Sequence, residues 1–199
     1  MSAPTTPFAI DVSAAVHALV LAEAAARTVL DLRNTSGGGD LHLALFATPA
    51  EGMAPPSATD ADAVQSFMNG LLIAEHGAAA TALPVAEVGL SKRQVVRMKA
   101  FECVHAGVDS YVAIQRRAKF DGATRSYGSH LFRQPVVGGG SIGLIAAASG
   151  WRAEQDYLAA MIVPATLQSV LTEYGALPRE EIESDSFLLD GGAWAYPAA

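Results

Sequence analysis

Residues 136–148 read "VVGGGSIGLIAAA", and three interpretations of this stretch lead to three different folds. As G-x-G-x-x-G, the glycines at 138, 140 and 143 have the spacing of a dinucleotide-binding turn. As G-x-S-x-G, Ser141 has the position of a hydrolase nucleophile. As a simple glycine turn, the same residues join two strands of a hairpin, because glycine readily adopts the positive φ angles that such turns require.

The two catalytic interpretations fail on what surrounds the motif. Pro135 precedes the glycines and is poorly tolerated in the central strand that a dinucleotide-binding fold requires. Only 56 residues follow Gly143, too few for the rest of a doubly wound sheet. In the hydrolase fold a histidine follows the nucleophile, whereas all five histidines precede Ser141. We therefore expect a hairpin of residues 130–137 and 141–149, with Pro135 on an edge strand or at a bulge.

Helical periodicity predicts helices on both sides of this hairpin. The first covers residues 12–33, and the second covers residues 61–76 with Asp60 as its N-cap. The last covers residues 151–174, where Pro164 is expected to kink the helix or split it.

A long central helix is predicted to begin at Ser91, whose spacing to Gln94 forms a capping box. It continues to about residue 119, with a bend expected at Gly107. Residues 41–47 alternate in the way that is typical of a strand. The predicted fold is α+β: an antiparallel sheet with a C-terminal hairpin, packed by an N-terminal, a long central and a C-terminal helix.

Composition indicates one globular domain, which we place at residues 1–178, followed by an acidic and then aromatic tail at residues 179–199. Apolar residues make up 51% of the chain, but no window reaches the length of uncharged sequence that a membrane span requires. The single cysteine, Cys103, excludes an intrachain disulfide and predicts a reducing compartment, which we take to be the cytoplasm. We expect its side chain to be a small core residue.

Charge is distributed unevenly along the chain. Residues 92–133 hold nine basic and three acidic residues, a net charge of +6, which leaves −13 on the remainder. Such a basic strip is suited to an anionic ligand or to the acidic surface of another subunit, although long solvated helices also carry such charges. Nucleic acid is not expected, because the chain is acidic and lacks a basic motif interleaved with aromatic residues. The candidate ligand-binding residues are Arg116, Arg117, Arg125, Tyr127, His130 and Arg133.

Glu102 and His105 have the spacing of a di-iron ligand pair on a helix, but the chain has no second E-x-x-H. We therefore predict no metal site built from side chains alone. His105 and His130 remain candidate ligands to the iron of a bound haem. His130 is the better of the two, because it lies in a turn-rich basic segment.

Residues 135–160 resemble the C-terminal part of the GlcG/HbpS-like family, small proteins associated with haem or corrinoid binding. That family ends with a hairpin whose second strand reads roughly G-x-I-x-x-S-G, followed by a helix that opens with an E-Q-D triplet. Residues 37–56 are similar to the family's earlier glycine-led strand and G-x-x-P loop. With one extra residue in the strand, the matching residues are Gly143, Ile145, Ser149, Gly150, Glu154, Gln155 and Asp156.

The resemblance implies an α+β sandwich with a hairpin near the C-terminus, and haem as a candidate cofactor. The basic helix that begins at Ser91 departs from the family's pattern, so no binding residue is carried over.

Three classes of function stay open. The first is a small-ligand-binding or sensor protein for an anionic molecule such as a tetrapyrrole, with arginines binding its carboxylates and a histidine its metal. The second is a self-associating assembly protein without catalytic activity, a homo-oligomer whose opposite charges attract and whose association weakens with ionic strength. The third is an enzyme without a recognisable motif, which is less favoured because no complete catalytic set is visible.

Overall fold

In the computed structural model, the description covers residues 10–30, 41–77, 90–117, 128–136 and 140–173. These residues form four strands and five helices. The strands are β1 (His42–Ala47), β2 (Leu72–Gly77), β3 (Ser129–Pro135) and β4 (Ser141–Ser149). The helices are α1 (Val12–Val29), α2 (Ala61–Leu71), α3 (Lys92–Ala106), α4 (Ser110–Arg117) and α5 (Ala153–Glu173).

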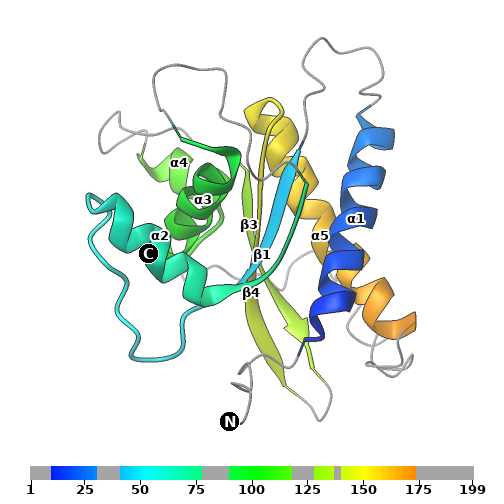
Figure 1. Cartoon of the computed structure of the whole chain (residues 1–199), viewed down its shortest axis with the longest axis horizontal. Helices are drawn as coiled ribbons and strands as arrows, with labels where there is room; N and C mark the ends of the chain where they lie inside the picture. Colours follow the sequence, from blue (N-terminus) through cyan, green and yellow to red (C-terminus); the bar gives the residue numbers. More distant parts are fainter. Residues whose placement is uncertain (1–9, 31–40, 78–89, 118–127, 137–139, 174–199) are drawn as a thin grey trace.

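The four strands form one antiparallel sheet in the order β2-β1-β4-β3, between two layers of helices (Figure 1). Helices α1 and α5 cover one face, and α2 and α3 cover the other. The predicted α+β class is therefore confirmed, with the N-terminal, central and C-terminal helices all present.

The central strand β1 is buried on both faces, because successive side chains of a strand point to opposite sides. Leu43 and Leu45 pack toward α1 and α5, whereas Ala44 and Phe46 pack toward α2 and α3. Its neighbour β4 presents the alanines at 146–148 to both layers. These small side chains let the helices approach the sheet closely.

The glycine-rich stretch of residues 136–148 leads into the second strand of a hairpin, and its residues 137–139 lie outside the described residues. Strands β3 and β4 pair antiparallel, with Pro135 opposite Ser141, and Gly140 has a φ of 91°. Pro135 lies on an edge strand, where its missing N–H costs no bond to a neighbouring strand. The hairpin interpretation is confirmed, and β4 occupies the middle of the sheet.

The prediction of a single helix over residues 61–76 was wrong at its C-terminal end. Asp60 does cap α2, but the helix stops at Leu71 and the backbone becomes extended at Leu72. The following residues form β2, which pairs with β1 from Leu72 to Gly77. The helical pattern of Val64, Met68 and Leu71 holds as far as the end of α2. Beyond it, pairing with β1, a strand distant in sequence, decides the conformation.

The long central helix is two helices. Ser91 and Gln94 form the predicted capping box, and α3 then ends at Gly107, which has the left-handed φ of 65°. Glycine adopts this conformation at little cost, so it ends the helix and does not merely bend it. In contrast, α5 runs as a single helix through the buried Pro164 and is not split there.

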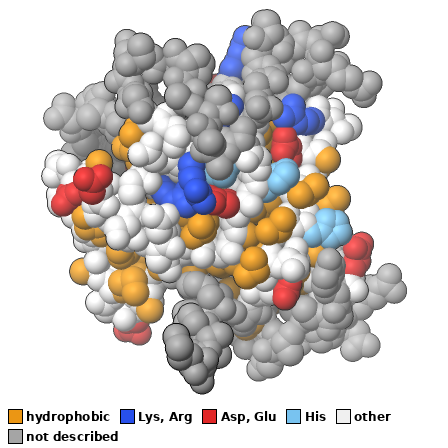
Figure 2. Space-filling view, in the orientation of Figure 1, with side chains coloured by type: hydrophobic (Ala, Val, Ile, Leu, Met, Phe, Trp, Pro, Cys, Tyr) orange, Lys and Arg blue, Asp and Glu red, His pale blue; other side chains and the backbone are white. Residues whose placement is uncertain are grey.

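Helix α1 is long and apolar enough, by length and composition, to cross a membrane. Within the fold, however, its inner side is part of the core: the buried residues are Ala14, Ala15, Ala18, Leu19, Ala22 and Ala26. Core helices of soluble proteins meet the same criteria. The outer side of α1 lies at the surface, where hydrophobic side chains are visible on that flank of the molecule (Figure 2).

A buried ion pair joins the two helical layers at one end of the sheet. Lys99 Nζ on α3 lies 2.8 Å from Asp156 Oδ2 on α5 and donates to Ala148 O at 2.9 Å. Trp151 N donates to the other carboxylate oxygen of Asp156 at 2.9 Å. Burial raises the pKa of Asp156, and Lys99 opposes this shift. Removing one partner of such a pair costs about 3–5 kcal/mol, because the other charge is left buried.

Gly128 makes room for this ion pair and gives a first prediction. A Cβ there would lie 2.7 Å from Ala148 O and 2.9 Å from both Lys99 Nζ and Asp156 Cβ, at a φ of 123°. We expect Gly128→Ala to lower the free energy of unfolding by about 2–3 kcal/mol in urea denaturation. Gly70→Ala is the control, since a Cβ on this helical glycine meets nothing within 4 Å and is expected to stabilise slightly. Equal stabilities of the two variants would contradict this account.

Candidate functional site

The candidate site lies at the outer edge of the sheet, where the turn between α3 and α4 meets β3. An edge strand needs partners for its outward backbone groups. Asp109 supplies one: its Oδ1 accepts a hydrogen bond from Leu131 N at 2.6 Å. The Asp109 backbone carbonyl accepts from Ala113 N at 2.8 Å and so begins α4. Hydrogen bonds therefore hold both the side chain and the backbone of Asp109 in place.

The same carboxylate holds His130. His130 Nδ1 lies 2.9 Å from Asp109 Oδ2, and Tyr157 OH on α5 donates to that oxygen at 2.9 Å. Because an ionised carboxylate can only accept hydrogen bonds, the proton of this contact is on Nδ1, and in the neutral ring Nε2 is the nitrogen with the lone pair. No described residue forms a hydrogen bond to Nε2. A carboxylate on the far ring nitrogen is the arrangement that orients histidines which bind metals.

Aromatic rings surround this imidazole on the α5 side of the sheet. Tyr157 meets the His130 ring edge-on at 6.4 Å, and Phe132 stacks on it at 5.9 Å. Tyr111, the second residue of α4, stacks on Tyr157 at 5.9 Å and is 48% exposed. The His130 side chain itself is 16% exposed. The site is thus a partly open imidazole beside an accessible aromatic surface.

The predicted ligand-binding residues are only partly brought together. Arg133 lies three residues after His130 on β3 and therefore points to the opposite face of the sheet, where it is exposed. Arg116 and Arg117 are the last residues of α4. Arg125 and Tyr127 lie outside the described residues, as does the predicted tail at residues 179–199. The roles of these residues stay predictions.

Two residues of the site carry no sequence signal that we recognised. Asp109 is 21 residues from His130 and belongs to no motif. Tyr157 directly follows the E-Q-D triplet of residues 154–156. For Asp109, the signal in the sequence is its place two residues after Gly107, which ends α3. A polar side chain just after the end of a helix can reach a neighbouring element.

Three cations of the predicted basic strip, Arg93, Arg97 and Lys99, form ion pairs within the fold. Arg97 donates to Asn69 Oδ1 at 2.6 Å and lies 3.4 Å from Glu75 Oε2, while Arg93 forms a bidentate pair with Glu75. Lys99 is held by Asp156. These three cations join elements of the protein to one another, and a role of the rest of the strip in binding an anion stays a prediction.

Cys103 is a core residue, as predicted. It is 1% exposed, and its Sγ lies 3.1 Å from Ser129 Oγ. Burial raises the pKa of this thiol to about 12. A thiol that stays protonated and has no access to solvent does not act as a nucleophile.

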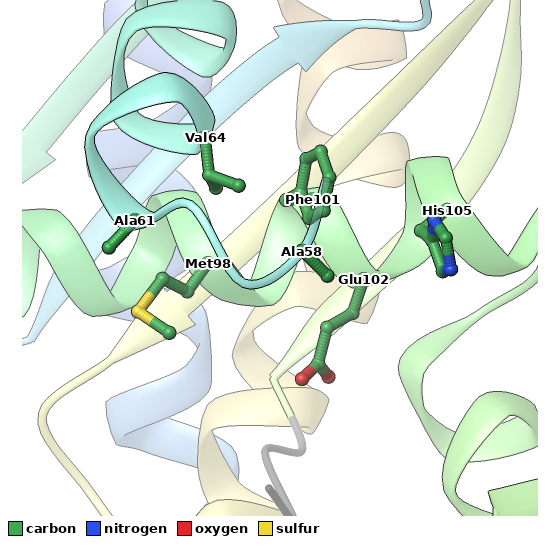
Figure 3. Close-up of a pocket in the computed structure, with 7 residues that line it drawn as sticks. All are labelled: Ala58, Ala61, Val64, Met98, Phe101, Glu102 and His105. Carbon is green, nitrogen blue, oxygen red and sulfur yellow. The ribbon is translucent and has the colours of Figure 1, made fainter. Parts of the chain in front are cut away.

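The second candidate haem ligand, His105, lies at a separate hollow between α2 and α3 (Figure 3). Its exposed ring stacks on Phe101 at 6.1 Å. The hollow has a volume of about 130 Å³ and is lined by Ala58, Ala61, Val64, Met98, Phe101, Glu102 and His105. Its size suits a group of a few atoms, well below a typical ligand pocket of roughly 300 Å³ or more. The Glu102 carboxylate in its wall would also repel an anionic ligand.

On the α3 face of the sheet, His42 is a buried imidazole beside a charged cluster. It is fully buried, and neither ring nitrogen forms a hydrogen bond with a described residue. Its Nε2 lies 3.5 Å from Glu75 Oε2, which Arg93 and Arg97 already bind. Burial, and then the charges of Arg97 and Arg93, lower the pKa of His42 to about 4. The ring is therefore neutral near pH 7.

Comparison with known proteins gives matches to solved structures at low sequence identity. No protein family matches the sequence, and no curated protein matches it. A solved structure of a double mutant of HbpS from Streptomyces reticuli is 17% identical, with a TM-score of 0.46 over 84% of this chain and 98% of that chain. A PduOC–haem complex is 16% identical, with a TM-score of 0.40 over 76% of this chain and 91% of that chain.

His42 gives a prediction for the pH dependence of stability. The pKa of His42 is about 4 in the folded protein, against 6.5 for the free side chain. Between these two pH values the unfolded chain therefore binds a proton at His42 that the folded chain does not bind. Wild type should therefore lose stability, relative to His42→Leu, between pH 6.5 and 4, by up to about 3 kcal/mol. Urea denaturation at both ends of this range measures it, with His105→Leu as the control for loss of an exposed imidazole. If the difference in free energy of unfolding between wild type and His42→Leu were the same at both pH values, the lowered pKa of His42 would be refuted.

Proposed function

We propose that the protein binds a planar anionic small molecule with a metal centre, through the lone pair of His130 Nε2. The observation that carries this proposal is the contact of His130 Nδ1 with the buried Asp109 carboxylate at 2.9 Å. One histidine is enough to hold haem iron, because the macrocycle supplies the in-plane ligands. Haem is therefore the first ligand to test.

Several residues around His130 would each have a separate role in holding such a ligand. Asp109 fixes the tautomer and the orientation of the His130 ring, and its negative charge makes Nε2 a stronger ligand. Tyr157 and the backbone of Leu131 hold Asp109 in turn. The exposed ring of Tyr111 offers a surface on which a planar molecule can stack. When bound, haem would supply an iron centre for redox chemistry or gas binding.

Cations near the site would bind the carboxylates of the ligand. Helix α4 begins beside Asp109, and about 10 Å of helix separates Ser110 from its last residues, Arg116 and Arg117. We propose these two arginines as the anion-binding pair. Arg133 is a weaker candidate, because strand alternation places it on the opposite face of β3 from His130.

Haem titration of the purified protein tests the proposal. We expect saturable, near-stoichiometric binding with a shifted Soret band, which His130→Ala abolishes and His105→Ala leaves unchanged. Asp109→Asn should weaken binding roughly 10- to 100-fold, because it keeps the shape of the side chain but removes its charge. Far-ultraviolet circular dichroism confirms that each variant is folded.

Two results would overturn the proposal. One is binding that does not saturate in wild type. The other is saturable binding that persists in folded His130→Ala. Loss of binding in His105→Ala alone would move the site to the hollow between α2 and α3.

A further inference from the structure

The hollow between α2 and α3 combines an apolar floor with one charged wall (Figure 3). Phe101 and Val64 are each 3% exposed and belong to the hydrophobic core on this side of the sheet, so they form its floor. Glu102 is 9% exposed and forms part of the wall. Ala58 and Ala61 are exposed and lie at the opening. The hollow therefore has an apolar interior that is accessible from solvent, as a site for a small molecule requires.

The side chains around the hollow explain why it is not filled. Phe67 on α2 and Phe101 on α3 meet edge to face, with 6.2 Å between the ring centres, and this bulky contact separates the two helices. Toward the start of α2, the side chains that face the hollow are small, namely Val64 and Ala61. Atoms that line unfilled space lack the dispersion contacts of a packed interior. A molecule of the right shape would supply these contacts.

The volume of the hollow selects the size of such a molecule. It measures about 130 Å³. An apolar cavity of about 150 Å³ engineered into another protein binds benzene. A single aromatic ring therefore fits, whereas two fused rings or a macrocycle such as haem do not.

The carboxylate of Glu102 selects the polarity of the molecule. An ionised carboxylate only accepts hydrogen bonds, and its two oxygens together accept as many as about four. It can therefore accept one from a ligand in addition to its interactions within the protein. Repulsion between like charges is stronger in a poorly exposed wall than in water, which disfavours an anionic ligand. A neutral ring with one hydrogen-bond donor meets both conditions.

We propose that the hollow binds a phenol, with the ring against Phe101 and the hydroxyl group donating to the Glu102 carboxylate. The pKa of a phenol is roughly 10, so the hydroxyl keeps its proton near pH 7. The ring of Phe101 adds an edge-to-face or offset contact with the ring of the ligand. This site goes beyond ligand binding at His130, and none of its lining residues belongs to the His130 site.

NMR titration of the full chain with phenol, toluene and benzoate tests the proposal, with the methyl signals of Val64 and Met98 as the readout. We expect saturable shifts with phenol at roughly millimolar concentration, an affinity that a molecule of this size can reach. Toluene has the shape of phenol without the donor and should bind roughly 10-fold more weakly. Benzoate should not bind, because its carboxylate meets that of Glu102.

Three variants locate the binding. Ala61→Met fills the hollow from the first residue of α2 and should weaken phenol binding at least about 10-fold. Ser66→Met is the matched control, since Ser66 is exposed on α2 and does not line the hollow. Glu102→Gln keeps the shape but removes the charge, so the preference for phenol over toluene should fall several-fold. His130→Ala should leave phenol binding unchanged, so that this proposal and the proposed haem site can fail separately.

Circular dichroism establishes that each variant is folded. Phenol-induced shifts that do not saturate, or that leave the signals of Val64 and Met98 unmoved, overturn the proposal. Saturable binding that persists in folded Ala61→Met also overturns it, as does benzoate that binds as tightly as phenol. An unchanged preference for phenol over toluene in Glu102→Gln would contradict the role given to the carboxylate.

Discussion

The ion pair between Lys99 and Asp156 is the interaction on which the arrangement of this fold depends. It joins α3 on one face of the sheet to α5 on the other, around the end of β4, and is possible only because Gly128 leaves the space for it. Ser129, the next residue, donates through Oγ to the Lys99 carbonyl at 2.8 Å. Strand β3 is therefore fixed to α3 at its first residue, and this fixes the position of His130.

From this anchor the candidate site is assembled from three separate elements. The turn after α3 supplies Asp109, β3 supplies His130, and α5 supplies Tyr157. A carboxylate that accepts three hydrogen bonds in a nearly buried position has little freedom to rotate, so the imidazole it holds is pre-oriented. Binding then does not have to order the ring.

The sequence predicts local structure well where a few neighbouring residues determine it. It predicts local structure poorly where contacts between residues distant in sequence determine it. The Ser91 capping box and the glycine hairpin are both encoded within a few residues. Residues 72–76 were assigned to a helix, because their strand conformation depends on pairing with β1, some 30 residues away. The pairing of Lys99, one member of the basic strip, could not be predicted for a similar reason: its partner Asp156 lies 57 residues further along the chain. Asp109 and Tyr157 were missed because their contacts are also long-range.

The central claim of this account is that Asp109 holds His130 in the tautomer with a free Nε2. Nitrogen-15 NMR of histidine-labelled protein at pH 8 tests it most directly, with His130→Gln assigning the signal. The account predicts a proton on Nδ1 and an unprotonated Nε2 for His130, and loss of this preference in Asp109→Asn. A proton found on Nε2 of His130 would contradict the account.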